Sequence, residues 1–570
     1  MNRRRGLVVA AGLALSVVLV VVRCVQLMVL QHDYWADRAR RQQEQIIKAP
    51  APRGRIVSAD GYVLATSVER FAIQLDTKAV VYPELFAETA APLLGCPAED
   101  LRRRLSGGAR SVWIAQRVER EKAETVQALA PNAVVLVPDT QRVYPLGVVA
   151  APVVGFVGRE ELVTVGRVGL EHYYDALLSG EANTYLAIHD AVQRRLSLRR
   201  LEEGRAGYDL ELTISARLQA ACERELAEVL EARQAKAVSA VVLEAQTGSI
   251  LAIVSLPSFD PDSPSDVPPS DWRLRPVQDA YEPGSVVKPL VAAAALGRGV
   301  VRTGELFDCR QRGIRIAGRW LRDHAAPGMY TLDEIVKESA NAGIVQVALR
   351  LPREELWRTF DDFGFGRRTG VGFPGESSGI LPPVKSWSGL SQASLALGQE
   401  LTVTPLQVAL AYAAIANGGW LLQPRLVARA TGDEQSVPDR EKWRAHVLDA
   451  ALSERVGRML EAVVEDGTGS KAAVPGYRVA GKTGTAQRAV QGTFDDVHHV
   501  AWFAGFLPQP DPSVVVVVAV EEPGGEFWGA TVAAPVFARV AQAAMSHLAV
   551  APTEEIEPTE EIEPVEGEAT

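Results

Sequence analysis

The longest apolar run in the chain lies near the N-terminus and predicts one transmembrane helix. No charged residue occurs from Gly6 to Val22, and the run continues past Arg23 to Leu30, which is long enough to span a bilayer. A cleaved signal peptide has a shorter apolar core and a small-residue cleavage site, so we expect an uncleaved signal anchor. Charge does not orient this helix, because its two flanks carry equal numbers of arginines: Arg3, Arg4 and Arg5 against Arg38, Arg40 and Arg41.

After the apolar run the chain divides into a mixed region and, about two hundred residues further along, a region with strong strand signals. From 32 to 207 short apolar runs are mixed with arginine-rich stretches, which indicates a mixed α/β region. Two β-branched runs, 238–244 and 249–255, then flank the turn signal Ala245-Gln246-Thr247-Gly248. They predict an antiparallel hairpin that opens a new domain.

Three later segments predict further elements of that domain. The alanine-rich stretch after Gly284 predicts a long helix. A second helix is expected over 406–416, where Asn417-Gly418-Gly419 would end it. The valine-rich run 514–520 is typical of a central strand.

Composition indicates a multidomain chain that folds mostly in water. A length of 570 residues exceeds what one core supports, and 47% hydrophobic with 23% charged residues excludes a mostly disordered or polytopic membrane protein. The net charge of −10 is concentrated in residues 551–570, whose eight glutamates leave −2 for the rest and predict a disordered acidic tail. A nearly neutral body gives no support to nucleic-acid binding. The scattered cysteines indicate neither a zinc site nor a disulfide scaffold: Cys24, Cys96, Cys222 and Cys309.

One short motif has the residue types of a serine nucleophile with its base. Ser285 and Lys288 form the only Ser-x-x-Lys in the chain, and the preceding Pro283-Gly284 places the serine at a helix N-terminus. Hydroxyl and amine then share a helix face, so a neutral Lys288 could take the proton as Ser285 attacks a carbonyl. The helix end would favour negative charge on the attacked oxygen. Alone the motif is weak, because an exposed helix start fits it equally well.

Two further motifs make the combination specific. Ser339-Ala340-Asn341 begins 54 residues after Ser285, and Lys482-Thr483-Gly484-Thr485 begins 197 residues after it. This three-part set, in this order, is typical of β-lactamases and penicillin-binding proteins. Together with the predicted anchor, it makes the chain resemble a class B penicillin-binding protein, an anchored peptidoglycan D,D-transpeptidase.

The resemblance covers nearly the whole chain. One departure is Ser58-Ala59, where the family usually has Asp-Arg, and it puts in doubt any salt bridge that those residues make. The ending Phe527-Trp528-Gly529 with 533–537 resembles the cell-division (septal) branch. Matching segments of the first half are Arg53-Gly54-Arg55-Ile56, Gly61, Leu64-Ala65, Arg142, Tyr144-Pro145 and Gly169-Leu170-Glu171. Those of the second half are Thr247-Gly248, Ile250-Leu251-Ala252, 257–261, 404–407 and 417–419.

The resemblance implies a role for each motif residue. The penultimate D-Ala of a stem pentapeptide would acylate Ser285, the terminal D-Ala would leave, and an amine of a second peptide would form the cross-link. Lys288 would be the base, since burial and the nearby Lys482 both disfavour its charged form. β-Lactams would acylate the same serine. The other implied roles are proton relay by Ser339, substrate-amide binding by Asn341, positive charge from Lys482, carboxylate binding along Thr483, Gly484 and Thr485, and an oxyanion hole from the backbone N–H groups of Ser285 and Thr485.

The implied fold class is mixed α/β (α+β). We expect a cytoplasmic tail and anchor over 1–31, an extended α/β pedestal over 32–207, a transpeptidase domain with an antiparallel sheet flanked by helices over 208–550, and the acidic tail over 551–570. The catalytic domain would lie outside the cytoplasmic membrane, and no cofactor is implied. Because no segment of 32–207 resembles a glycosyltransferase, the implied partners are a membrane glycosyltransferase and other division proteins, contacted through anchor and pedestal.

Other interpretations of single motifs are weaker. Residues 476–483 spell the P-loop pattern G-x-x-x-x-G-K-[ST], but no apolar strand precedes them and no helix signal follows Thr483. His498-His499 is not accompanied by the further histidines or acidic residues that a metal site requires, so we expect both histidines to be strand residues. Asp323-His324 and Glu282 are expected to be structural.

Other classes of function stay open as alternatives. An elongation-type class B transpeptidase would carry the same motifs. A penicillin-sensing receptor would need a signalling domain across the membrane, for which we expect only Met1 to Arg5. A carboxypeptidase or β-lactamase would use water as acceptor, but such chains are usually shorter and lack the pedestal motifs.

Overall fold

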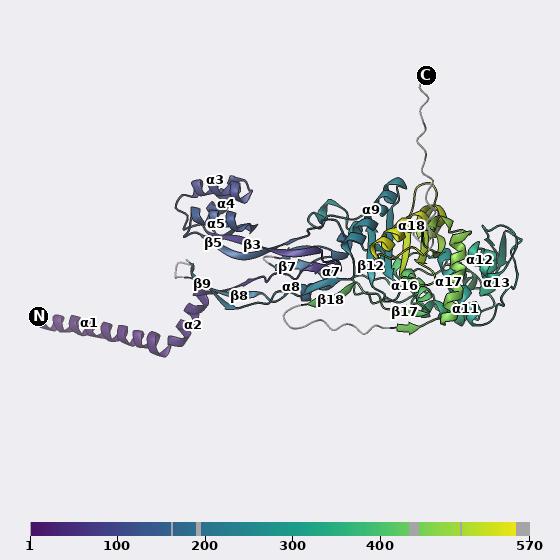
Figure 1. The fold of residues 1–570 in the computed structure, drawn as a ribbon. Helices are drawn as coiled ribbons and strands as arrows, with labels where there is room; N and C mark the ends of the chain where they lie inside the picture. Colours follow the sequence, from purple (N-terminus) through teal and green to yellow (C-terminus); the bar gives the residue numbers. More distant parts are fainter. Residues whose placement is uncertain (1, 161–162, 190–194, 432–443, 491–492, 554–570) are drawn as a thin grey trace, which may run out of the picture.

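The computed structural model describes residues 2–160, 163–189, 195–431, 444–490 and 493–553. Figure 1 shows an elongated molecule in which a lone helix, a slender middle part and a large globular part follow one another. The predicted acidic tail lies outside the described residues from 554 onward. Its beginning is attached to the globular part, because the backbone N–H of Thr553 donates to the carbonyl of Gly476 over 2.8 Å.

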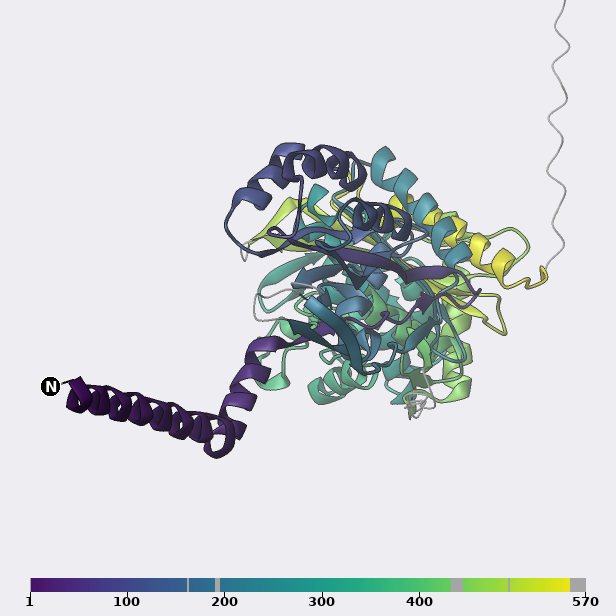
Figure 2. The same ribbon diagram turned by 90° about the vertical axis from the view of Figure 1, so that its left-hand side faces the viewer.

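The lone helix is the predicted apolar segment. It consists of α1 (Asn2–Val25) and a π-helical turn η1 (Gln26–Leu30), and the stretch Arg5–Leu30 is long and apolar enough to cross a membrane. No residue in the most apolar part of this stretch is buried against the rest of the described chain. These features are consistent with a membrane anchor. Figure 2 shows the bend that separates α1 from α2 (His32–Gln43), which leads to the slender part.

The slender part is built on one long strand, β3 (Val63–Asp76). This strand pairs antiparallel with β5 (Val134–Val143) and, toward its end, with β4 (Ser111–Val118). Three helices cover the end that lies far from the globular part, and we call them the head: α3 (Pro83–Leu94), α4 (Ala98–Ser106) and α5 (Arg120–Leu129). The head has its own apolar core, to which β3 contributes Ile73 and Leu75 and the helices contribute Phe86, Leu101 and Val126.

A second sheet and several short elements complete the slender part. β1 (Glu44–Ala49), β8 (Asn183–His189) and β9 (Arg195–Glu202) form an antiparallel sheet, and β6 (Val157–Glu160) pairs with β7 (Val163–Gly166). The short helices here are α6 (Ala151–Val154), α7 (Gly169–Tyr173) and α8 (Asp175–Ser179).

Three residues of the matched pedestal motifs form a buried ion cluster. Glu171 accepts from Arg53 Nε at 2.5 Å and from Arg142 Nε at 2.6 Å, and Arg53 Nη1 reaches Asp175 at 2.7 Å. The side chains of Arg53, Arg142 and Glu171 are at most 3% exposed. Because removing one partner would leave an uncompensated buried charge, these residues depend on one another. The cluster joins β5 and α7 to the segment before β2 (Ile56–Val57).

Asp60 directly follows Ser58-Ala59, the departure from the family pattern, and makes contacts of its own. Its carboxylate accepts from Ser215 Oγ (2.9 Å) and from the backbone N–H groups of Ala216 (2.8 Å) and Arg217 (3.2 Å). Ala216 and Arg217 lie in the first turn of α9 (Ala216–Ala232). Burial acts to raise the pKa of Asp60, but hydrogen bonds from Ser58 and from the helix start outweigh it and lower the pKa well below its usual range. Asp60 therefore caps a helix of the globular part from the turn between β2 and β3.

The globular part is organised around a five-stranded antiparallel sheet. Its strand order is β12-β11-β22-β21-β20, which makes β22 (Val514–Glu521) the central strand, as predicted. The predicted hairpin is also confirmed, since β11 (Ala237–Glu244) and β12 (Ile250–Leu256) pair antiparallel. β20 (Ala480–Val490) and β21 (Thr493–Leu507) form the other edge. A smaller strand, β10 (Asp209–Leu212), pairs with β2 on one side and with β18 (Val427–Thr431) on the other, so the slender and globular parts share a sheet.

Helices cover both faces of the five-stranded sheet. Val516 and Val518 of β22 point to the core that contains α9 and α18 (Gly529–His547), whereas Val515 and Val517 point to the core that contains α16 (Pro405–Ala416). Figure 1 shows α9 and α18 on one side of the strands and α16 on the other. Burial of both faces is the physical reason for an uninterrupted valine run in a central strand.

The helix expected after Gly284 has an unexpected beginning. Residues Gly284–Val287 form a 3₁₀ turn, and the α-helix α11 starts at Lys288 and ends at Gly297. The remaining helices are α10 (Arg275–Gln278), α12 (Leu332–Lys337), α13 (Asn341–Ala348), α14 (Arg353–Asp362), α15 (Ser391–Ala396) and α17 (Ala450–Glu465). The remaining strands are β13 (Phe307–Asp308), β14 (Gly313–Ile316), β15 (Arg319–Arg322), β16 (Met329–Tyr330), β17 (Trp420–Leu422) and β19 (Arg444–His446).

Candidate active site

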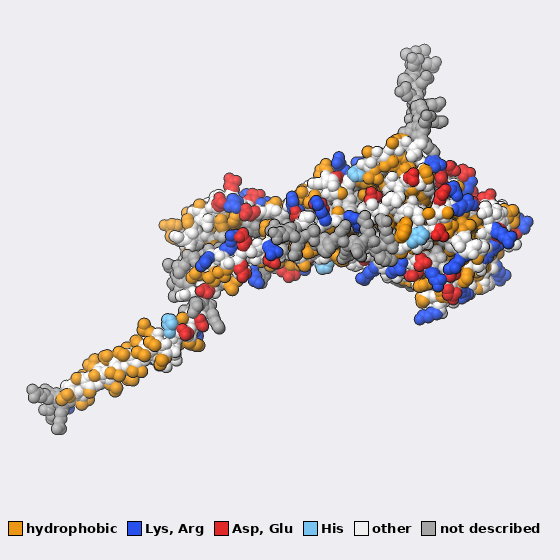
Figure 3. All heavy atoms as spheres, turned by 60° about the horizontal axis from the view of Figure 1, so that its bottom comes forward, with side chains coloured by type: hydrophobic (Ala, Val, Ile, Leu, Met, Phe, Trp, Pro, Cys, Tyr) orange, Lys and Arg blue, Asp and Glu red, His pale blue; other side chains and the backbone are white. Residues whose placement is uncertain are grey.

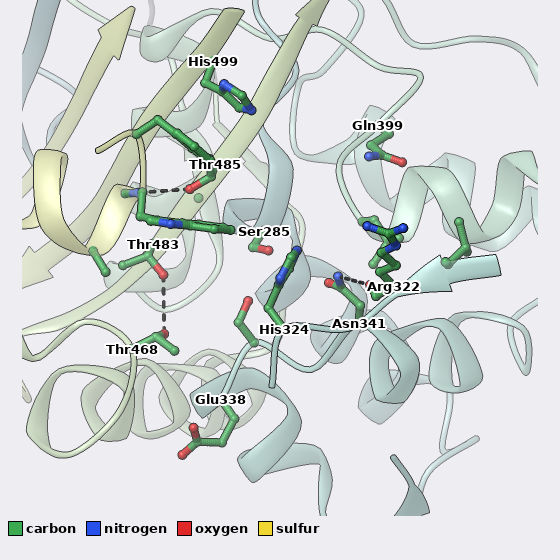
Figure 4. A pocket seen from close by; sticks show the side chains of 18 of the residues that line it. Ser285, Arg322, His324, Glu338, Asn341, Gln399, Thr468, Thr483, Thr485 and His499 are labelled. Atoms are coloured by element: carbon green, nitrogen blue, oxygen red, sulfur yellow. Dashed lines mark hydrogen bonds between the residues drawn. The ribbon is translucent and has the colours of Figure 1, made fainter. Parts of the chain in front are cut away.

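The three predicted motifs meet at one cavity of about 530 Å³ between β20 and the helices α11 to α13. Ser285 lies in the 3₁₀ turn before α11, Asn341 begins α13, and Thr483 and Thr485 lie in β20. Figure 4 shows Ser285 between the threonines on one side and Asn341 on the other. Residues almost 200 positions apart therefore share one site.

Close backbone packing places the Ser285 turn against β20. Gly284 has φ +58°, and a Cβ atom there would lie 2.8 Å from the carbonyl oxygen of Thr485. Gly484 has the same restriction, since its Cβ would lie 2.8 Å from the carbonyl oxygen of Pro283. Only glycine permits this approach at both positions. It brings the backbones of Ser285 and Thr485 to the same end of the cavity.

Lys288 is fully buried and directed at the second motif. Its Nζ donates to the Ser339 carbonyl (2.6 Å) and to Asn341 Oδ1 (2.6 Å), and it lies 3.2 Å from Ser339 Oγ. Burial lowers the pKa of Lys288 to about 7, although nearby Asp323 acts in the opposite direction. A neutral amine keeps two hydrogens for the two short contacts and a lone pair for a third partner.

Backbone strain and a helix cap hold the second motif in place. Ser339 has φ +58°, a left-handed conformation that is unusual for a residue with a side chain. Asp323 accepts from the backbone N–H of Ala342 at 2.7 Å and so caps α13, which is a structural role of the kind we expected. Asn341 Nδ2 donates to the Arg322 carbonyl at 2.9 Å, and its second hydrogen remains available to a ligand.

Lys482 is the second buried amine of the site. Its Nζ donates to Thr483 Oγ1 (3.2 Å), to the Thr483 carbonyl (3.3 Å) and to Thr468 Oγ1 (3.5 Å). Burial and the neighbouring Lys288 lower the pKa of Lys482 well below its usual range. Among the described residues no carboxylate lies within salt-bridge distance of this amine, so its charged form has only neutral partners.

Thr485 is tied to the start of α18. Its Oγ1 accepts from the backbone N–H of Gly529 at 3.0 Å, which leaves its hydroxyl hydrogen free to point at a ligand. The first turn of α18 contains no acidic residue. The partial positive charge of the helix start therefore lies behind the hydroxyl and favours an anionic ligand in front of it.

Several residues line the cavity that the motifs did not reveal. Thr468 accepts from Thr483 Oγ1 at 3.4 Å and donates to the Lys337 carbonyl at 3.2 Å. His324, which we expected to be structural, lies on the wall and contacts Trp528 edge-on, with ring centroids 5.2 Å apart. No short pattern marks such single residues in a sequence. Other additions to the wall are Trp320, Arg322, Glu338, Gln399, His499 and Phe527.

The structure also decides the weaker interpretations. Lys482 and Thr483 lie inside strand β20, and the segment before them forms only the 3₁₀ turn Ser470–Ala472, so the P-loop pattern is not a nucleotide site. His499 belongs to β21 as expected and stacks on Phe527, with ring centroids 4.0 Å apart. In the described part of the chain no three His, Cys, Asp or Glu side chains are grouped to hold a metal. Glu282 accepts from the backbone N–H of Glu400 at 2.9 Å and so links the Ser285 turn to the loop of Gln399.

Comparisons with known proteins agree with this geometry. Residues 238–542 match the family "Penicillin binding protein transpeptidase domain", and residues 48–212 match "Penicillin-binding Protein dimerisation domain". Stage V sporulation protein D of Bacillus subtilis is 34% identical over 518 residues, which cover 88% of this chain and 79% of that protein. Peptidoglycan D,D-transpeptidase FtsI of Escherichia coli K12 is 31% identical over 527 residues, which cover 91% and 87%.

A solved structure supports the same assignment at the level of the fold and the sequence. Penicillin binding protein 3 of Mycobacterium tuberculosis, complexed with aztreonam, superposes with a TM-score of 0.70 at 28% identity and covers 90% of this chain and 99% of that chain. Both halves of the chain, with their order and their three catalytic-type motifs, are thus accounted for by one family. The chain belongs to the class B penicillin-binding proteins, the family of serine-type peptidoglycan D,D-transpeptidases.

Proposed function

We propose that Ser285 is the nucleophile of the transpeptidation and Lys288 its general base. The observation that carries this proposal is a buried amine whose pKa is lowered to about 7, one helical turn from a serine on the cavity wall. Ser285 Oγ would attack the carbonyl carbon of the penultimate D-Ala, and its proton would pass to Lys288 Nζ. The C–N bond to the terminal D-Ala would then break and leave an ester on Ser285.

Ser339 would carry the proton from Lys288 to the leaving amine. Its Oγ lies 3.2 Å from Lys288 Nζ, and its backbone carbonyl accepts from the same amine at 2.6 Å. In the second half of the reaction, an amine of another stem peptide attacks the ester, its proton returns through the same groups, and Ser285 regains its hydroxyl. Asn341 would hold the substrate amide through its free Nδ2 hydrogen.

The strand β20 would recognise the terminal carboxylate and the oxyanion. Thr483 and Thr485 supply hydroxyls, and a carboxylate beside Lys482 would restore the charge that burial disfavours. The backbone N–H groups of Ser285 and Thr485 would stabilise the oxyanion, which is supported by the close packing of Gly284 on Thr485. β-Lactams carry a similarly placed carboxylate and would acylate Ser285 in the same way.

The cellular role we propose is septal wall synthesis from the outer side of the cytoplasmic membrane. It is supported by the apolar N-terminal helix, by the similarity to FtsI and by the residues 527–529 of the septal branch. A membrane glycosyltransferase and other division proteins would bind the anchor and pedestal. The proposed domain boundaries are 1–31 for the anchor, 32–207 for the pedestal, 208–550 for the transpeptidase domain and 551–570 for the acidic tail. The catalytic domain must lie where stem peptides are found.

Labelling with a fluorescent penicillin, followed by peptide mass mapping, tests the assignment of the nucleophile. We expect one labelled peptide, containing Ser285, and complete loss of the label in Ser285→Ala. Ser265→Ala is the matched control, because Ser265 also lies in a 3₁₀ turn, Pro264–Asp266, but is exposed and outside the cavity. Undiminished labelling of Ser285→Ala would reject the proposed nucleophile.

A further inference from the structure

The head carries a group of exposed apolar side chains at its tip. Val81 and Tyr82 precede α3, Leu85 lies in its first turn and Leu129 ends α5, with exposed fractions of 78%, 71%, 62% and 40%. Single exposed apolar residues are common, whereas a group of them indicates a contact surface. We call these four residues the head tip.

Strand pairing places the head tip at one end of the molecule. β3 ends at Asp76, whose N–H donates to the carbonyl of Ala133 at 2.8 Å, and Leu75 pairs with Val134 at the start of β5. The segment 77–82 and the end of α5 therefore close the same end of the sheet. The other end of β3 pairs with β2, beside the globular part.

The membrane anchor leaves from the end that carries the head tip. β1 pairs with β8 and lies against β5, and α2 connects β1 directly to the apolar helix. Figure 1 shows α1, α2 and the head together at the end opposite the globular part, and Figure 2 looks at that end. Figure 3 shows hydrophobic side chains along α1 and a second group of them at the left-hand end of the head, away from the globular part.

Aromatic residues mark the expected height of the membrane surface. Tyr34 and Trp35 follow the apolar helix directly and are 59% and 41% exposed. Tyr and Trp at such positions are typical of the membrane–water interface. Figure 1 shows the bend between α1 and α2 at the same end of the molecule as the head, so the head tip lies near the same surface.

We propose that the head tip rests on the lipid surface from which the anchor emerges, as a second membrane contact of this chain. Val81 and Leu85 provide apolar side chains for the region below the headgroups, and Tyr82 has the amphipathic ring that this region favours. The exposed Lys78 in the same loop suits lipid phosphates. One helix alone can rotate and tilt, whereas two contacts fix how the elongated body stands. The inference rests on the membrane insertion of α1.

Three exposed valines of the full-length chain allow a matched test. V29C places a cysteine in the apolar helix, V81C in the head tip, and V148C near the globular part, where Ala150 N–H donates to Glu223 of α9. The native valines are 67%, 78% and 54% exposed, so labelling disturbs no core. Cys24 and Cys96 are replaced by serine, and an environment-sensitive dye is attached. Each variant must still bind fluorescent penicillin.

The labelled chains are placed singly in nanodiscs of phosphatidylethanolamine and phosphatidylglycerol with spin-labelled lipid, and dye fluorescence is compared with discs lacking the spin label. We expect loss of fluorescence at positions 29 and 81 and none at 148. Quenching at 29 alone would overturn the proposal and leave the anchor intact, and would instead favour a protein partner at the tip. Absence of quenching at all three positions would overturn the anchor and the proposal together.

Discussion

The acylation rate should rise steeply with pH between about 6 and 8, because the proposed base Lys288 could accept the Ser285 proton only in its neutral form. With a pKa of about 7, the amine is neutral in about one molecule in eleven at pH 6, in one half at pH 7 and in about ten of eleven at pH 8. The rate constant at saturating penicillin should therefore increase about tenfold across this range. Stopped-flow acylation with a chromogenic cephalosporin at fixed ionic strength measures it.

Two variants separate Lys288 from its neighbours. Lys288→Arg keeps a positive charge at all these pH values, so acylation should fall at least about 100-fold throughout. Burial also raises the pKa of Glu282 to about 7, and this residue lies just before the Ser285 turn. Glu282→Gln should keep the rising profile. A profile that is flat from pH 6 to 8 in the wild type, or that becomes flat only in Glu282→Gln, would refute the role of Lys288.

Three further predictions concern residues outside the Ser285–Lys288 pair. Thr468→Val should raise the penicillin concentration for half-maximal acylation about fivefold, the equivalent of ~1 kcal/mol for a lost hydrogen bond, and Thr468→Ser should restore it; equal behaviour of the two variants would contradict the role of the hydroxyl. Asp60→Ala should lower the stability of the ectodomain by about 1–2 kcal/mol at neutral pH. Because the folded-state pKa of Asp60 is lowered, its contribution is complete above the unfolded value of about 3.9 and declines as the pH falls from there toward the lowered folded-state pKa. Denaturation should therefore show a larger difference between wild type and variant at pH 7 than at pH 3, and equal differences at the two pH values would contradict this role of the Asp60 carboxylate. Deleting 554–570 should change neither acylation rate nor melting temperature, and a loss of either would show that this segment binds the folded body.

The parts of the fold that follow a periodic pattern could be predicted from the sequence. The run 514–520 is apolar at every position because both faces of β22 are covered, and the 238–255 hairpin has strong turn residues between two β-branched runs. The start of α11 could not be placed correctly. Gly284 adopts a positive φ to let the turn approach β20, and that approach is a tertiary contact which no local pattern records.

The residues of the candidate site also fall into those that could be predicted from the sequence and those that could not. The three motifs are recognisable because their chemistry requires fixed spacings between residues that are close in the sequence, as between Ser285 and Lys288. Thr468 and His324 reach the cavity from separate loops, so only the fold brings them there. Asp60 is an intermediate case: the sequence shows the departure from the family pattern at the neighbouring Ser58-Ala59, but the role of Asp60 as the cap of α9 depends on a helix about 150 residues away.

In the proposed mechanism the two buried lysines would make substrate recognition and proton transfer interdependent. Both side chains are fully buried, and the neighbouring Lys288 helps to lower the pKa of Lys482, to which the described residues give only neutral hydrogen-bond partners. A substrate carboxylate at Thr483 and Thr485 would favour the charged form of Lys482. A charged Lys482 would in turn favour the neutral form of Lys288, which is the form that accepts a proton. With Lys288 as the proposed base, binding of the correct anion at β20 would therefore prepare it for proton transfer, and we expect a ligand without that carboxylate to lose part of the acylation rate as well as affinity.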